Sequence, residues 1–202
     1  MDGFARRKEQ SKEDIRKAAW ELFSRFGVDK VSMTDIARKA GVSQATIYNN
    51  FGSKEALARE FVTAMVEGLV SRVKEILTSK RPYQEKMAAF LQFISGMMAD
   101  GKPASKGVEV FTSSLDLQND PEIHAIRVKA QEKMIALLLG LIEEGRRVGQ
   151  VNKEISEEAL RIYFVLFMDA FTHPEFQRQY THHPNLVNEL GSLMFYGLKG
   201  KK

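Results

Sequence analysis

The chain has 202 residues, of which 44% are hydrophobic and 28% are charged, a composition typical of a folded globular protein with a sizeable core. It contains no cysteine, which excludes disulfides, thiolate metal sites and a cysteine nucleophile. No apolar run reaches the roughly 18 residues of a membrane span, and no apolar segment follows the charged N-terminus as in a secretory signal. We therefore expect a cytoplasmic protein that does not enter the membrane.

Positive charge is concentrated in the first third of the chain. The net charge is +4, and residues 1–60 hold twelve Lys or Arg against nine Asp or Glu. Residues 61–202 hold eighteen against seventeen. Such an excess gives weak support to a polyanionic partner, because ordinary solvated surfaces have similar balances.

The pattern predicts helices almost throughout, since proline occurs only five times and no long period-2 alternation is present. The first helix is expected over residues 11–26, with Ser11 as N-cap and an apolar stripe that ends at Phe26. Gly27 then supplies the left-handed stop. Upstream, a basic arm for DNA and an ordinary frayed terminus are both open for Arg6, Arg7 and Lys8.

Two short helices follow. Ser32 is expected to cap the first, with Asp35 completing a capping box, and Gly41 ends it near residue 40. Ser43 caps the second, which closes at Phe51 and Gly52. A long fourth helix is expected to start at Ser53 and to continue past Val73.

The third helix has an unusual outward face. Ile47 and Phe51 are spaced i, i+4 and are expected to face inward. The outward and flanking positions are small or uncharged and rich in amide and hydroxyl groups: Gln44, Ala45, Thr46, Tyr48 and Asn49. These groups match the donors, acceptors and methyls of base edges in the major groove, and a glycine-cornered helix pair has the shape that enters it. A helix pair that binds nothing is the alternative; Lys54, placed to meet a phosphate at the start of the fourth helix, favours DNA.

The segment "AAWELFSRFGVDKVSMTDIARKAGVSQATIYNNFGSKEALAREFV" resembles the N-terminal DNA-binding domain of the TetR family of bacterial transcriptional regulators, over about residues 11–65. The resemblance implies that Thr34 contacts DNA backbone or base and that Gln44, Ala45 and Thr46 contact the major groove. It also implies phosphate contacts for Tyr48 and Lys54. Asn49 and Asn50 stand where family members often carry aromatic residues or histidine, so we treat Asn49 as a hypothetical adenine contact.

The remaining chain is predicted to be a helical bundle. Helices are expected from Pro82, around 108–115, over 120–147, from Ser156 and from about Pro184, with a loop over 100–107. The fold class is thus all-α, with a helix-turn-helix domain over 1–55 and a ligand-binding and dimerisation domain over 56–202. No catalytic residue or cofactor is expected. His173, His182 and His183 could suggest a metal site, but the adjacent pair His182 and His183 lacks the i, i+4 spacing of a helical metal site, so no metal is expected.

The aromatic and methionine residues of the bundle are read first as core. The resemblance implies a second role, lining a cavity for a small hydrophobic effector. The candidates for this ligand site are Phe90, Phe93, Met97, Phe111, His124, Tyr163 and Phe167, with Arg127, Gln131 and Asp169 as further polar groups.

The last two helices are expected to form a homodimer surface. Their apolar stripes are Leu160, Phe164, Phe167 and Phe171, and Leu186, Leu190, Leu193 and Met194. A two-fold dimer predicts a palindromic operator, and the resemblance implies a repressor released by its effector, with activation left open. An enzyme built on a bundle is disfavoured because no catalytic constellation is visible and Glu143 and Glu144 read as solvated surface. An architectural DNA-binding protein without an effector stays open.

Overall fold

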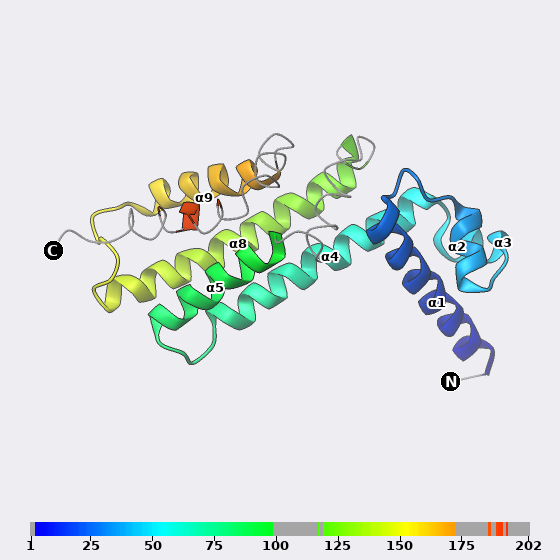
Figure 1. The fold of residues 1–202 in the computed structure, drawn as a ribbon, viewed down its shortest axis with the longest axis horizontal. Coiled ribbons are helices and arrows are strands. Elements are labelled where there is room, and N and C mark those ends of the chain that lie inside the picture. Colours follow the sequence, from blue (N-terminus) through cyan, green and yellow to red (C-terminus); the bar gives the residue numbers. More distant parts are fainter. Residues whose placement is uncertain are drawn as a thin grey trace. The chain divides into compact units, whose positions relative to one another are not determined.

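The structure is a computed structural model that describes residues 3–98 and 119–172, together with residues 117, 186, 189–191 and 193. Every regular element among these residues is a helix, which confirms the all-α prediction (Figure 1). The helices are α1 (Gly3–Phe26), α2 (Met33–Ala40), α3 (Gln44–Phe51), α4 (Lys54–Leu77), α5 (Tyr83–Met98), α8 (Pro121–Arg147) and α9 (Glu157–Thr172).

Helix α1 begins at Gly3, so the predicted start at Ser11 is wrong. The residues before Ser11 are mostly good helix formers, which continue a helix without a cap. Gln10 Nε2 also donates to Asp14 Oδ1 at 3.0 Å, an i, i+4 hydrogen bond across the predicted boundary. Ser11 therefore lies inside the helix.

The other predicted helix ends are confirmed where they are described. Ser32 and Ser43 cap α2 and α3, and Gly41 ends α2 in the left-handed conformation with φ 67°. Asp120 accepts hydrogen bonds from the first turn of α8, and Ser156 Oγ accepts one from Ala159 N of α9.

The chain forms two compact units. Unit 1 comprises residues 1–65 and 106–124, and unit 2 comprises 66–105 and 125–202. Helices α4 and α8 each contribute a segment to both units. The predicted boundary after residue 55 separates a DNA-binding from a ligand-binding function, whereas the two units are defined by compactness. The functional boundary therefore stays a prediction.

Unit 1 has a core built by α1, α2, α3 and the start of α4. Ile15 and Phe23 of α1, Ile36 of α2, Ile47 of α3 and Val62 of α4 are all fully buried. The spacing of these residues places them on the inner faces of their helices. Helix α1 therefore packs against both short helices, and it also meets the start of α4 through the rings of Phe23 and Phe61.

Unit 2 has a separate core shared by the second half of α4 with α5, α8 and α9, which Figure 1 shows alongside one another. Its buried residues include Val73, Met87, Leu138, Leu160 and Phe164. No helix in the described part of the chain is long and apolar enough to cross a membrane.

Several predictions fall outside the described residues. These are the 100–107 loop, the helix around 108–115, most of the last helix, Phe111, His173, His182, His183 and Met194, and also the side chain of Phe171.

Candidate nucleic-acid interface

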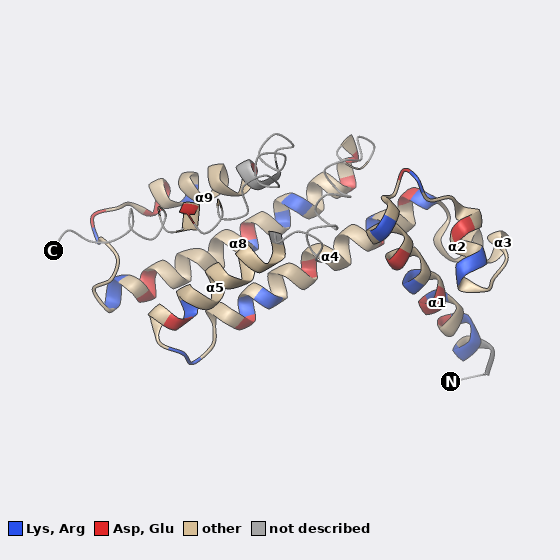
Figure 2. Ribbon diagram, viewed as in Figure 1, with Lys and Arg blue, Asp and Glu red and all other residues tan. Residues whose placement is uncertain are grey.

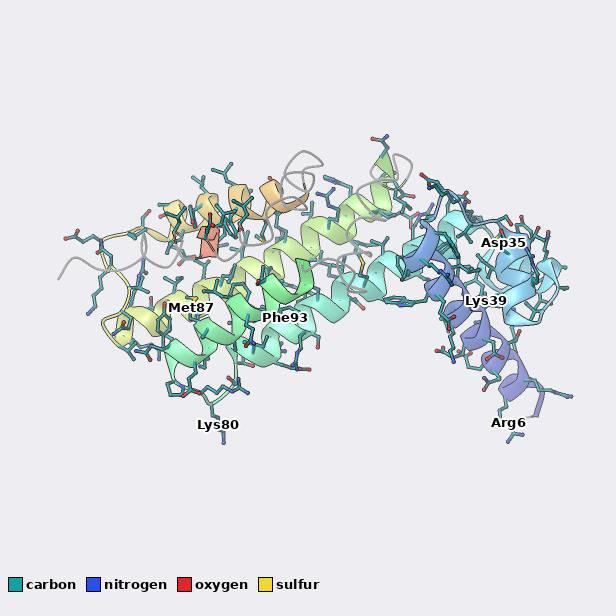
Figure 3. All side chains as sticks on the ribbon, viewed as in Figure 1. Arg6, Asp35, Lys39, Lys80, Met87 and Phe93 are labelled. Atoms are coloured by element: carbon teal, nitrogen blue, oxygen red, sulfur yellow. The ribbon has the colours of Figure 1, made fainter. Side chains whose placement is uncertain are left out.

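The start of α2 is fixed by reciprocal capping. Asp35 N donates to Ser32 Oγ at 3.2 Å, and Ser32 N donates to Asp35 Oδ2 at 3.1 Å. The Ser32 hydroxyl, its backbone N–H and the charge of Arg38 together hold the pKa of Asp35 below its usual value. On the same helix, Lys39 Nζ lies 2.6 Å from Glu21 Oε2 of α1 (Figure 3). Helix α2 is thereby anchored at both ends.

Helix α3 is anchored by one buried residue and exposes an uncharged face. Ile47 is 0% exposed, whereas Gln44, Ala45, Tyr48 and Asn49 are exposed. Figure 2 shows no acidic or basic residue on this helix. The structure therefore brings these four predicted DNA-binding residues onto one accessible surface.

Thr46 and Asn50 contribute less to that surface. Thr46 is half-buried, and its hydroxyl lies 2.9 Å from Ser43 Oγ, while its backbone N–H donates to the same oxygen at 3.1 Å. Asn50 is also half-buried and donates from Nδ2 to Thr46 O at 2.8 Å. The outward position expected for Thr46 is thus a flank, occupied by a capping interaction.

Gln44 is connected to the preceding helix. Its Nε2 donates to Thr34 Oγ1 at 2.5 Å, across the turn between α2 and α3. Both residues are exposed. The first predicted contact on α2 and the first on α3 therefore form one hydrogen-bonded pair on the surface.

Lys54 is the first residue of α4, as expected, and its side chain is half-buried. Ser53 Oγ accepts a hydrogen bond from Ala56 N at 3.1 Å. The Ser53 hydroxyl also lowers the pKa of Glu55 by donating to its carboxylate. The positive end of the α4 dipole and the Lys54 ammonium together favour an anion at this helix start.

Arg16 supports the far end of α3. Its Nε donates to Glu60 Oε2 of α4 at 2.9 Å, and its guanidinium carbon lies 5.5 Å from the centroid of the Phe51 ring. One side chain from α1 thus contacts the last residue of α3 and the first half of α4. Sequence reasoning missed Arg16, because its two partners are far along the chain.

Arg6, Arg7 and Lys8 lie on the exposed first turns of α1 (Figures 2 and 3). They are helical, so a frayed terminus does not describe their backbone. A role in DNA binding stays a prediction for these three residues.

A second ion-pair group in unit 1 joins the start of α4 to the start of α8. Arg59 Nε lies 2.9 Å from Asp120 Oδ2, and Arg59 NH1 lies 3.1 Å from Glu122 Oε1. Asp120 also accepts from the backbone N–H groups of Glu122 and Ile123 at 2.8 and 3.1 Å. The hydrogen bond from Arg59 is the main cause of the lowered pKa of Asp120. Asp120 was predicted as a cap, but its pairing with Arg59 was not.

The predicted effector residues are only partly brought together. Phe90 is buried in the unit 2 core, and Phe93 and Phe167 pack against that core. Tyr163 stacks on Phe167 with ring centroids 6.1 Å apart. Met97 is half-buried on α5.

The polar candidates belong to different units. His124 is exposed and belongs to unit 1. Gln131 Nε2 donates to Asp169 Oδ1 at 3.3 Å in unit 2. Arg127, also in unit 2, is half-buried.

Unit 2 also contains a buried ion pair that the sequence did not reveal. Lys86 is the buried charged residue among the described residues, and its Nζ lies 2.7 Å from Glu144 Oε2. Burial, with a smaller effect of the Glu144 charge, raises the pKa of the neighbouring Tyr83. Glu144 is therefore not the solvated surface residue that its position beside Glu143 suggested.

The exposed apolar face of α9 differs from the predicted stripe. Leu160 and Phe164 are buried in the core of unit 2, whereas Ile162 and Leu166, spaced i, i+4, are 63% and 65% exposed. Phe167 packs against the core. Ile162 and Leu166, together with Tyr163, are the large apolar side chains that α9 exposes among its described residues.

Comparisons with known proteins agree with this architecture. Residues 15–61 match the family model described as "Bacterial regulatory proteins, tetR family". The HTH-type transcriptional regulator YhgD of Bacillus subtilis is 25% identical over 196 residues, covering 92% of this chain and 94% of YhgD.

Two crystal structures share the fold along most of the chain. The reduced form of NemR from E. coli superposes with a TM-score of 0.70 at 16% identity, covering 95% of this chain and 99% of NemR. FadR from Bacillus subtilis in complex with stearoyl-CoA has a TM-score of 0.66 at 21% identity, covering 92% of this chain and 98% of FadR.

Proposed function

The chain belongs to the TetR family of DNA-binding transcriptional regulators, and we propose that it is a repressor that a small hydrophobic effector releases from a palindromic operator. The family is one of regulators and not of enzymes. The proposed site of action is the bacterial cytoplasm, where operator DNA is accessible.

The observation that carries the proposal is the exposed face of α3. Gln44, Tyr48 and Asn49 offer amide and hydroxyl groups to solvent, while Ile47 fixes the helix from behind. Surface side chains of this kind suit base edges and phosphates. We assign base contacts to Gln44, Ala45 and Asn49 and phosphate contacts to Tyr48 and Lys54, with Thr46 at the edge of the site.

The proposed effector is a hydrophobic small molecule bound in unit 2. The aromatic residues Phe93, Tyr163 and Phe167 are each partly accessible, and Tyr163 and Phe167 stack on one another. FadR, which shares the fold, is described with stearoyl-CoA bound. Mass spectrometry of small molecules retained by the purified protein tests this assignment directly.

The proposed link between effector and DNA is the pair of helices that contribute to both units. A displacement of the unit 2 segment of α8 would move Asp120, which precedes the first residue of that helix. Because Asp120 is ion-paired with Arg59, the displacement would also move α4 just beyond Lys54. A coupling of about 1–3 kcal/mol would change operator affinity by roughly 5- to 150-fold.

The proposed repressor is a homodimer that uses the exposed apolar face of α9. Ile162 and Leu166 would be covered by a second copy of the chain. A two-fold dimer presents two α3 helices to successive turns of one face of the duplex.

Replacing Lys54 and Gln44 separates the two kinds of DNA contact. Lys54→Ala should weaken binding to all duplexes about equally and reduce the salt slope of binding by roughly one unit. Gln44→Ala should instead cost affinity mainly for the cognate site, by about 1–3 kcal/mol. Fluorescence anisotropy with cognate and scrambled duplexes over a salt series measures both.

The same titrations test the architectural alternative. An architectural protein would show steep salt dependence with little preference between cognate and scrambled duplexes. Equal losses on both duplexes for Gln44→Ala would contradict base reading by this residue.

A further inference from the structure

Resting on the proposed function, we propose that Thr34 determines operator specificity through Gln44, by holding the glutamine amide so that it reads adenine. The observation is the hydrogen bond from Gln44 Nε2 to Thr34 Oγ1, at 2.5 Å between two exposed side chains. The two residues lie on different helices, ten positions apart in the chain.

The first consequence of this hydrogen bond is order. A glutamine side chain on a protein surface has several rotatable bonds, and immobilising it on binding costs free energy. Thr34 is itself fixed, because α2 begins with the Ser32–Asp35 capping box and Met33 beside it is buried. Gln44 is therefore ordered before DNA binds. The lower entropic cost strengthens binding only to a duplex whose base contacts the ordered amide.

The second consequence concerns the donors that remain. A glutamine amide has two N–H donors and one carbonyl acceptor. With one N–H given to Thr34, the amide retains one donor and the acceptor Oε1. Adenine presents one acceptor, N7, and one donor, N6, in the major groove, whereas guanine presents two acceptors. The Thr34-bound amide thus satisfies both groups of adenine and only one of guanine.

This role differs from a plain phosphate contact by Thr34. A phosphate contact supplies the same affinity on every sequence. A positioning role changes the preference at the one base that Gln44 contacts, and it disappears when Gln44 is removed.

The test is selection from a random 20-base-pair duplex library by the purified full-length protein, followed by sequencing of the bound duplexes. Thr34→Val keeps the shape of the side chain but removes the hydroxyl, and Thr34→Ser keeps the hydroxyl. Gln44→Ala identifies the base position that Gln44 reads, and the double variant completes the cycle. Thr78→Val is the matched control, since Thr78 is also exposed but caps the end of α4 in unit 2.

We expect Thr34→Val to lower the adenine-to-guanine ratio at that position by roughly 2- to 12-fold, the range that corresponds to ordering one side chain. Thr34→Ser and Thr78→Val should retain the wild-type ratio, and Thr34→Val should have no further effect on it in the Gln44→Ala background. Equal weakening on all sequences with an unchanged ratio would overturn the proposal and leave Thr34 as a phosphate contact. If Gln44→Ala alters no base preference, base reading by Gln44 fails, and the positioning role fails with it.

Folding of each variant is checked independently of DNA. Trp20 is the single tryptophan of the chain, and its ring lies 4.6 Å from that of Phe61 in unit 1. Unchanged tryptophan emission and melting temperature for Thr34→Val would establish that a lost preference comes from the missing hydroxyl. A variant that fails this check is replaced by Thr34→Ala, for which the same ratio change is expected and an unchanged ratio would again overturn the proposal.

Discussion

Lys86 and Glu144 form a pair in which the two partners have very different access to water. The side chain of Lys86 is 9% exposed, whereas that of Glu144 is 28% exposed. A buried ammonium without its partner is far more costly than a carboxylate that water can reach. Replacing Glu144 should therefore lower the free energy of unfolding more than replacing Lys86 does.

Glu144→Ala should destabilise the protein by about 2 kcal/mol, because it leaves the Lys86 ammonium buried and unpaired. Lys86→Met should cost about 1 kcal/mol or less, since Glu144 can be hydrated and the apolar stem is retained. Urea unfolding monitored by circular dichroism measures both. The double variant should be close to Lys86→Met alone, and a larger loss for Lys86→Met than for Glu144→Ala would contradict this explanation.

Interactions between residues close in the sequence were predictable, and those between residues far apart in the sequence were not. Ser32 and Asp35 of the capping box are three positions apart, so the spacing alone predicted their interaction. Lys86 and Glu144 are 58 residues apart, and Arg59 and Asp120 are 61 apart. Nothing in the sequence pattern indicates which distant charges meet, so Glu144 was interpreted as a solvated residue.

Among the helices, α8 contains two glycines in opposite environments. A Cβ atom on Gly145 would lie 2.6 Å from Val151 Cγ2 and 2.8 Å from Tyr83 Cε2. Gly140 is exposed, with nothing within 4 Å of an added Cβ. Gly145 therefore permits close packing of Tyr83 against α8, whereas Gly140 has no packing role.

Gly145→Ala should destabilise the protein by about 1–3 kcal/mol through overpacking, although alanine is the better helix former. Gly140→Ala is the matched control and should stabilise by up to about 1 kcal/mol. Thermal unfolding of both variants is the measurement. A stabilising Gly145→Ala would show that Tyr83 does not constrain the helix.

Element boundaries were predictable where a cap marks them and not where propensity continues a helix. Gly41 and Ser43 marked the turn before α3, and the structure has its boundaries there. Ser11 resembles a cap, but the helix formers before it extend α1 to Gly3. The exposed face of α3 followed from the inward positions predicted for Ile47 and Phe51. Thr46 was misplaced, because its hydroxyl and its backbone N–H both lie within hydrogen-bond distance of the hydroxyl of the capping residue Ser43.

For the whole molecule, dimerisation through α9 predicts that a charge introduced on the exposed apolar face of this helix weakens the dimer. Leu166→Asp should dissociate the dimer by placing a carboxylate in a buried apolar interface. Val148→Asp is the control, because Val148 is 52% exposed and follows the end of α8, so it is not a residue of α9. Sedimentation velocity reports the oligomeric state, and a Leu166→Asp protein that remains dimeric would exclude this face as the interface.

DNA reading by α3 is measured most directly by the sequences that the wild-type protein enriches from a random duplex library. We expect a two-fold symmetric motif whose half-sites are centred about 10 base pairs apart, or a multiple of that spacing. Gln44→Ala should blur one position in each half-site while Lys54→Ala leaves the motif unchanged. Binding with no enriched motif, or a motif unaffected by Gln44→Ala and by an Asn49→Ala variant, would contradict sequence reading by this helix.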